Sequence, residues 1–134
     1  MTQRIDRPLK IFILDDEKDI CFFFKEFLVR RGFDVVTALT GVAAVKVLKK
    51  EKPDIAILDI YLCKGKMNGI DVLKFIKEEQ SNCCCLMVSR ADDEKIVNQT
   101  KELGAEDYLL KPLMLEKIEK KINKIVLKIK KGRK

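Results

Sequence analysis

Five short apolar runs, each followed by a segment of helical length, constrain this chain more than any other feature. The runs occupy 10–14, 33–38, 53–59, 83–89 and 106–110. Strands separated by helix-length segments pair in parallel, and their right-handed crossovers place helices on both faces of the sheet. The stretches 55–58 and 86–88 are apolar at every position, which is typical of central strands buried on both sides. The alternation therefore predicts a doubly wound α/β sandwich.

The segments between the runs support five helices. Apolar residues recur at helical spacing in the first three segments, and turn residues delimit the last two. The expected inward positions are Ile20, Phe23, Phe24, Phe27 and Leu28 in the first helix, Val42, Val45 and Leu48 in the second, and Ile70, Leu73 and Ile76 in the third. Asp92 or Asp93 should open the fourth helix and Gly104 should close it, whereas the fifth follows Pro112. We expect the flavodoxin-like (βα)5 arrangement, with a parallel sheet in the order 2-1-3-4-5.

Length and charge bound the domain organisation. A chain of 134 residues suits one domain, here 1–134, with a core at about 9–124 and a basic helical extension or linker at 125–134. The net charge of +7 is uneven, because 111–134 holds ten Lys/Arg against Glu116 and Glu119, and the rest of the chain sums to −1. A basic excess on one helix, with no recognition module, predicts no direct binding to nucleic acid.

The apolar runs are too short to cross a bilayer, and 1–7 lacks the apolar core of a signal peptide. We therefore expect a cytoplasmic protein with no membrane insertion. The five cysteines form no C-x-x-C pair, and the chain has no histidine. They are expected to be small apolar residues, and not a zinc site or a disulfide framework.

Polar residues follow the strands at one edge of the expected sheet, where doubly wound folds bind their ligands. Asp15, Asp16 and Glu17 follow the first strand, Asp59 ends the third, Ser89 ends the fourth, and Lys111 with Pro112 follows the fifth. Clustered carboxylates favour a hard cation such as Mg²⁺, and a lysine and a hydroxyl suit phosphoryl oxygens. One aspartate is left to act as a nucleophile that forms an acyl phosphate. An Asp-Asp pair alone could equally be a helix N-cap, so the prediction rests on the joint placement.

Over roughly 9–124 the sequence resembles the receiver domains of two-component response regulators, including the single-domain receivers of chemotaxis and sporulation. The matching segments are I-F-I-L-D-D-E, P-D-I-A-I-L-D-I-Y-L, M-N-G-I-D-V-L, M-V-S-R-A-D-D and E-L-G-A-E-D-Y-L-L-K-P-L. The resemblance implies a phosphoacceptor switch and not an enzyme. It implies roles for eight positions: Asp59 as phosphoacceptor, Asp15, Asp16, Asp59 and the backbone carbonyl of Tyr61 as Mg²⁺ ligands, Lys111 as the phosphate-binding lysine, Ser89 and Tyr108 as the switch pair, and a cis peptide before Pro112.

Three positions depart from the family pattern. Asp59 and Gly69 are ten positions apart, more than the family usually has, with a basic loop at 63–66. Arg90 follows Ser89 where the family has a small residue. This cation could screen the site or hold a phosphate oxygen, but we expect its side chain to be solvated. Tyr61 lies where side chains can line the path of the hydrolytic water. The lifetime of the acyl phosphate therefore stays open.

The resemblance also implies partners. A histidine kinase or histidine phosphotransfer protein would donate the phosphoryl group, with Phe22 and Val29 on the first helix as a candidate docking surface. A downstream effector protein or effector domain would read the switch. Leu115, Ile118, Ile122, Ile125 and Ile129 form a short heptad seam. This seam is first expected to be core, although its last turns could serve as a linker or in a homodimer through the fourth and fifth helices.

Two other functions compete with the switch. The chain could be a docking module that works without phosphorylation, or the N-terminal receiver part of a longer regulator. An aspartyl-phosphate phosphatase of the haloacid dehalogenase type is disfavoured, because that class has D-x-D after its first strand and this chain has D-D-E.

Overall fold

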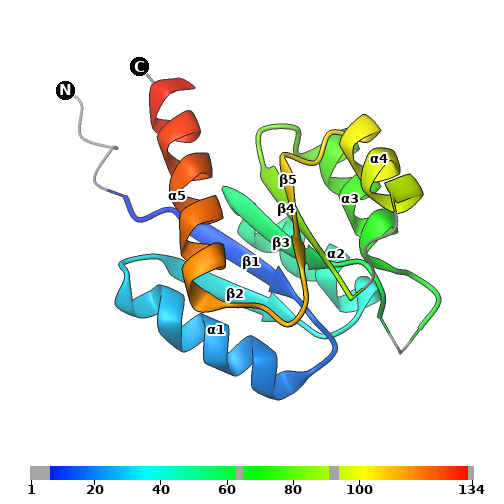
Figure 1. Cartoon of the computed structure of the whole chain (residues 1–134), viewed down its shortest axis with the longest axis horizontal. Helices are drawn as coiled ribbons and strands as arrows, with labels where there is room; N and C mark the ends of the chain where they lie inside the picture. Colours follow the sequence, from blue (N-terminus) through cyan, green and yellow to red (C-terminus); the bar gives the residue numbers. More distant parts are fainter. Residues whose placement is uncertain (1–6, 63–64, 91–93, 133–134) are drawn as a thin grey trace.

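The computed structural model describes residues 7–62, 65–90 and 94–132. Its centre is one parallel sheet of five strands in the order β2-β1-β3-β4-β5 (Figure 1). The strands are β1 (Lys10–Leu14), β2 (Asp34–Ala38), β3 (Ile55–Asp59), β4 (Cys84–Ser89) and β5 (Asp107–Leu110). The fold class and the strand order expected from the sequence are confirmed, and each strand lies within two residues of its expected bounds.

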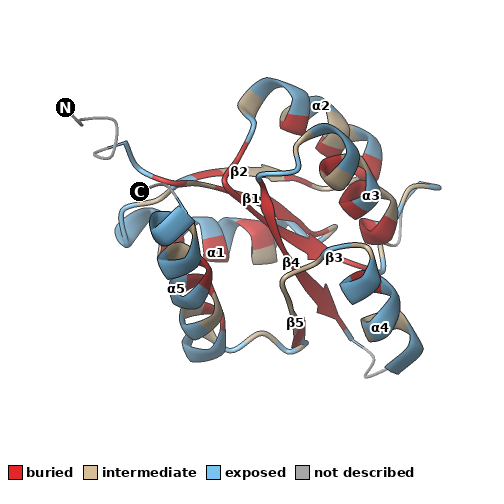
Figure 2. Ribbon diagram, turned by 90° about the horizontal axis from the view of Figure 1, so that it is seen from above, coloured by how far each residue is buried: buried red, intermediate tan, exposed pale blue. Residues whose placement is uncertain are grey.

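Five helices cover the sheet: α1 (Lys18–Arg30), α2 (Gly41–Glu51), α3 (Gly69–Glu79), α4 (Glu94–Glu102) and α5 (Leu115–Gly132). Figures 1 and 2 show α1 and α5 on one side of the sheet and α2, α3 and α4 on the other. Successive strand residues point to opposite faces, so Ile11 and Ile13 join the α1–α5 core, and Phe12 and Leu14 join the core on the other face. Two apolar cores therefore hold the sheet between them.

Local sequence explains several helix ends. The Asn68 side chain accepts hydrogen bonds from the N–H groups of Ile70 and Asp71, and Asp71 accepts from the N–H of Asn68, which completes a capping box at α3. At the end of α4, Gly104 has a φ of +103°. This left-handed backbone favours glycine, so the predicted end of the fourth helix is confirmed. Its predicted start, Asp92 or Asp93, lies outside the described residues.

Two predicted core positions are wrong. Phe23 is 53% exposed and Val42 is 60% exposed. The buried line of α1 passes through Cys21, Phe24 and Leu28, and Phe23 lies one residue, about 100°, to the side of it. The Phe23 ring instead meets the Phe24 ring edge-on at 5.3 Å. In α2 the buried residues are Gly41, Ala44 and Leu48, and Val42 lies about 100° from Gly41 and about 160° from Ala44 around the helix. Val45 is half-buried.

The seam of α5 packs on the sheet. Ile118, Ile122 and Ile125 are buried in the core shared with α1, and Leu115 and Ile129 pack partly buried against it. The expectation that this seam is core is confirmed; a linker or dimer role for the last turns stays a prediction. No helix among the described residues is both long enough and apolar enough to span a membrane.

Candidate functional site

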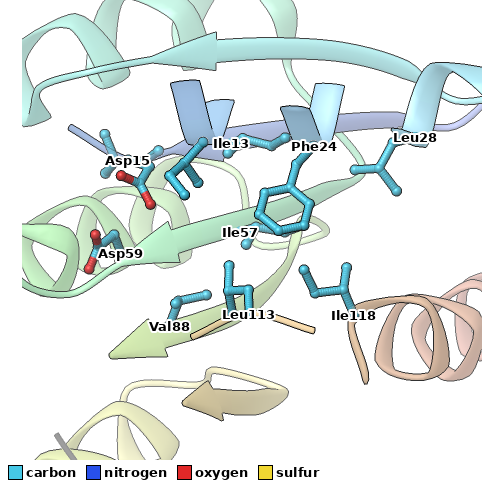
Figure 3. Close-up of a pocket in the computed structure, with 11 residues that line it drawn as sticks. Ile13, Asp15, Phe24, Leu28, Ile57, Asp59, Val88, Leu113 and Ile118 are labelled. Carbon is cyan, nitrogen blue, oxygen red and sulfur yellow. The ribbon is translucent and has the colours of Figure 1, made fainter. Parts of the chain in front are cut away.

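Asp15, Asp59, Ser89 and Lys111 meet at the edge formed by the carboxyl ends of the strands. The register places Leu14 opposite Leu58, Asp59 opposite Val88, and Ser89 opposite Leu110, so all four strands end at nearly the same level. Asp15 and Asp59 are 3% and 2% exposed, and Ser89 is fully buried. Figure 3 shows the carboxyl groups of Asp15 and Asp59 side by side, from neighbouring strands. The predicted convergence of these residues is confirmed.

Lys111 joins the two buried aspartates. Its Nζ lies 2.9 Å from Oδ2 of Asp59 and 3.0 Å from Oδ2 of Asp15. Burial disfavours the lysine charge and lowers the pKa of Lys111, but the hydrogen bonds to Asp59 and Asp15 outweigh this, so the pKa is raised. Lys111 therefore remains a cation at neutral pH and holds both carboxylates in place.

Asp59 has a defined partner at each carboxylate oxygen. Oδ2 accepts from Lys111, and Oδ1 accepts from the backbone N–H of Tyr61 at 3.2 Å. Burial raises the pKa of Asp59, against the lowering effects of the hydrogen bond and the charge of Lys111. The carboxylate is thus poorly solvated but oriented, as a nucleophile in a positioned site should be.

Apolar side chains behind the carboxyl groups of Asp15 and Asp59 keep water away from them. A cavity of about 10 Å³ lies there, with apolar walls that include Ile57, Val88 and Leu113 (Figure 3). It is too small for more than about one water molecule. The back wall of the site is therefore largely apolar, and this burial raises the pKa of Asp59.

The oxygen ligands suit a hard divalent cation. Carboxylate oxygens of Asp15, Asp16 and Glu17 lie within 4.8 Å of one another; Asp15 is buried, Asp16 half-buried and Glu17 exposed. Oδ1 of Asp15 is held by the backbone N–H of Glu17 at 2.9 Å. With Asp59, these carboxylates outnumber the charge of Lys111, so an oxygen-binding cation such as Mg²⁺ fits the donor set. The carbonyl of Tyr61 as a further ligand stays a prediction.

The sequence assigned no role at the site to two residues that contribute to it. Gly69 N–H donates to the carbonyl of Ile60 at 3.1 Å, and a Cβ on Gly69 would overlap the carbonyl oxygen of Asp59. Only glycine allows the loop after Asp59 to close so tightly; the signal was a glycine directly before an apolar helix. Cys21 donates from Sγ to the carbonyl of Asp15 at 3.4 Å, a contact that no sequence pattern indicates.

The structure also places the predicted switch pair, Arg90 and the peptide before Pro112. The carbonyl of buried Ser89 accepts from the N–H of Lys111 at 2.8 Å, and half-buried Tyr108 packs against the core that α2, α3 and α4 share. Arg90 is exposed, as expected. The Lys111–Pro112 peptide is cis, the geometry that the resemblance implied. Residues 63–64 of the basic loop lie outside the described residues.

Comparisons with known proteins agree with this geometry. Residues 11–123 match the family of response regulator receiver domains. The chain is 35% identical over 117 residues to the alkaline phosphatase synthesis transcriptional regulatory protein PhoP of Bacillus subtilis, covering 87% of this chain and 48% of PhoP. It is 33% identical over 116 residues to the Bacillus subtilis chemotaxis protein CheY, covering 86% of this chain and 95% of CheY. The chain thus spans about half of one relative and nearly all of the other.

The fold also matches solved structures. A CheY-like receiver domain from Methanospirillum hungatei superimposes with a TM-score of 0.88 at 23% identity, over 94% of this chain and 99% of that one. At this identity the likeness concerns the fold alone. The receiver-family match over 11–123, together with the relatives at 33–35% identity, establishes the family. The chain belongs to the response regulator receiver domains of two-component systems.

Proposed function

We propose that this chain is a phosphoacceptor switch, phosphorylated on the carboxylate of Asp59. The observation that carries the proposal is the Lys111 ammonium held between Asp59 and Asp15. This cation lies where negative charge would grow on a phosphoryl group attached to Asp59. A histidine kinase or a histidine phosphotransfer protein is the proposed donor, because the family that the chain belongs to receives phosphoryl groups from such proteins.

The chemistry follows from the contacts of Asp59. A carboxylate oxygen attacks the phosphorus of a phosphohistidine; the new O–P bond forms as the P–N bond breaks, and the imidazole leaves with its electron pair. Lys111 balances charge on the transferred group, and the N–H of Tyr61 keeps the carboxylate oriented. Mg²⁺, held by Asp15, Asp16, Asp59 and the carbonyl of Tyr61, would supply further charge neutralisation.

The switch is proposed to run from Ser89 to Tyr108. Both lie at the β4–β5 end of the sheet, and Ser89 is joined to the phosphate-binding lysine through its backbone. A hydrogen bond from the Ser89 hydroxyl to the phosphoryl group would draw β4 toward Asp59 and let Tyr108 turn inward. Phosphorylation would thereby shift the population of two packings at α4, β5 and α5.

Partner docking is proposed at two places. Phe22 and Val29 on α1 are 67% and 46% exposed, and exposed apolar groups at this spacing suit contact with a phosphodonor. The surface of α4, β5 and α5 would be read by an effector protein, an effector domain or a second copy of the chain. PhoP, of which this chain matches 48%, favours the receiver part of a longer regulator as a second candidate.

The direct test is labelling with acetyl phosphate. We expect Mg²⁺-dependent incorporation of one phosphoryl group, lost in EDTA and in Asp59→Asn, with the label mapped to Asp59 by mass spectrometry after borohydride reduction. Lys46→Gln, at an exposed position on α2, is the matched control and should label normally. Undiminished labelling of Asp59→Asn would place the phosphoryl group on another residue, and no labelling of the wild type would favour a docking module that works without phosphorylation.

A further inference from the structure

The outer face of α5 carries a line of lysines to which the chemistry at Asp59 assigns no role. We define the lysine stripe as Lys117, Lys120, Lys124, Lys128 and Lys131, all exposed. Steps of three and four residues place them within about 80° of one another around the helix and along about 21 Å of its length. Figure 2 shows α5 exposed along its outer side and buried along the side that faces the sheet. We propose that this stripe docks an acidic, amphipathic segment of a partner protein.

The carboxylates of the domain neutralise little of the positive charge of the lysine stripe. Neighbouring Lys121 pairs with Asp107 at 2.8 Å, but within the stripe only Lys128 approaches a carboxylate, 3.9 Å from Glu106, and its side chain is 68% exposed. In the described part of the chain, no carboxylate lies within ion-pair distance of the other four stripe lysines. Lysines three and four residues apart on a helix repel one another. A partner that brings carboxylates to this face relieves that repulsion.

Leu127 adds an apolar anchor beside the stripe. Its side chain is 61% exposed, the only large apolar side chain of α5 that is exposed among the described residues. Leu127 lies three residues after Lys124 and four before Lys131, so lysines flank it on the helix surface. An exposed apolar residue bordered by cations matches a segment that carries both carboxylates and an apolar side chain.

These features favour a protein over other polyanions. The apolar face of α5 is occupied by Ile118, Ile122 and Ile125 in the core, so the helix cannot insert that face into a membrane. Helix α5 (Leu115–Gly132) contains no arginine and no aromatic residue, so it lacks the side chains that stack on bases. Two copies packed through this face would set lysines against lysines. A partner helix with carboxylates at steps of three and four matches the spacing.

The test uses the full chain and a synthetic probe. The probe is a fluorescein-labelled peptide of about 14 residues, which spans ~21 Å as a helix, with glutamates at steps of three and four and two leucines on the same face. We expect the triple variant Lys120→Glu, Lys124→Glu, Lys131→Glu to bind at least about tenfold more weakly. We expect Leu127→Gln to weaken binding about threefold or more, because the probe leucines lose their apolar contact.

Control variants distinguish a specific docking site from general electrostatic attraction to a basic protein. The variant Lys46→Glu, Lys50→Glu, Lys74→Glu makes the same charge change at exposed positions on α2 and α3, across the sheet, and should bind the probe nearly as the wild type does. Circular dichroism and urea unfolding check that each variant is folded. Asp59→Asn should bind the probe with the affinity of the unphosphorylated wild type, because Asp59 ends β3 and the stripe lies on the outer face of α5. Failure of acetyl phosphate labelling would therefore count against the switch and leave this proposal standing.

Several results would overturn the proposal. One is the absence of peptide binding at low ionic strength. Another is an equal loss in the α2–α3 control, which would reveal general attraction. A third is an unchanged affinity of Leu127→Gln, or of the wild type for a probe in which serines replace the leucines. Tighter binding of a short DNA duplex, or of vesicles rich in phosphatidylserine, would assign the stripe to a different class of partner.

Discussion

Replacing Lys111 by methionine should destabilise the domain strongly, because Lys111 is the cation that Asp15 and Asp59 share. The side chains of Asp15 and Asp59 are 5% and 2% exposed, so the variant leaves two carboxylates buried without a counter-charge. Removing one partner of a buried pair costs about 3–5 kcal/mol. A buried carboxyl group without a counter-charge can also take up a proton. At pH 7 this limits the loss in the free energy of unfolding to about 4 kcal/mol for each group. We expect Lys111→Met to lower the free energy of unfolding by about 3 kcal/mol.

The pH dependence has a definite sign. Burial already raises the pKa of Asp59, and losing Lys111 raises it further. A carboxyl group whose pKa is higher in the folded state binds more protons there than in the unfolded chain, so its contribution to stability improves as the pH falls. The difference between the wild type and Lys111→Met should therefore shrink between pH 7 and pH 4.5. Mg²⁺ should reduce the difference at pH 7 by replacing part of the lost charge.

Urea unfolding in EDTA, followed by circular dichroism, measures these quantities. Asp59→Asn removes one of the two carboxylates, so the double variant Asp59→Asn, Lys111→Met should recover at least about 1 kcal/mol relative to additivity. Lys121→Met removes a surface lysine from the same part of the chain and serves as the control. The reasoning is refuted if Lys111→Met costs less than about 1 kcal/mol at pH 7, or if the effects of Lys111→Met and Asp59→Asn simply add.

Three further predictions concern other contacts. Gly69→Ala should cost about 1–3 kcal/mol in urea unfolding and slow labelling by acetyl phosphate, because its Cβ would push on the carbonyl of Asp59. Burial raises the pKa of Asp107, but the hydrogen bond and charge of Lys121 outweigh this effect, so the pKa is lowered. The stability that this pair contributes is therefore present above the ordinary aspartate pKa and is lost as the pH falls through the lowered value. Lys121→Met should remove less than about 1 kcal/mol at pH 7 and almost nothing at pH 3. Burial raises the pKa of Cys21 to about 11, so iodoacetamide should modify Cys21 slowly at pH 8 in the native protein and quickly in urea, as peptide mass spectrometry can follow.

Each of these three predictions has an outcome that would contradict it. Wild-type stability of Gly69→Ala would mean that the loop shifts without cost. A loss in Lys121→Met that is as large at pH 3 as at pH 7 would assign the effect to packing and not to charge. Native-state labelling of Cys21 as fast as in urea would show that its thiol is accessible.

The fold can be predicted from the sequence because the signals are local and repeated. Each apolar run is flanked by a helical segment, and this alternation admits few topologies once crossovers are right-handed. The edge of the sheet that carries the site follows from the same rule, since parallel strands end together. Asp15, Asp59, Ser89 and Lys111 can therefore be grouped at one edge from their positions along the chain.

Helix faces were predicted less well. Phe23 and Val42 are apolar, yet both are exposed, because each lies about 100° or more from the buried line of its helix. A helix on a sheet buries a strip only as wide as its contact, and the distance between helix and sheet sets that width. In α2 the buried residues are Gly41, Ala44 and Leu48, and Val42 lies well to the other side of the helix. The distance between helix and sheet depends on both partners of a packing contact and cannot be read from one segment.

The order of elements, the edge of the sheet that holds the site, and the concentration of lysines in the last helix all follow from the chain's local patterns. The packed fold was needed to show that Lys111 lies between two buried aspartates, that Gly69 closes against the carbonyl of Asp59, and that the lysines of α5 line its outer face. The physical reason is that periodicity and strand direction are local properties of a chain. Distances between side chains from different strands exist only once the packed layers hold those strands side by side.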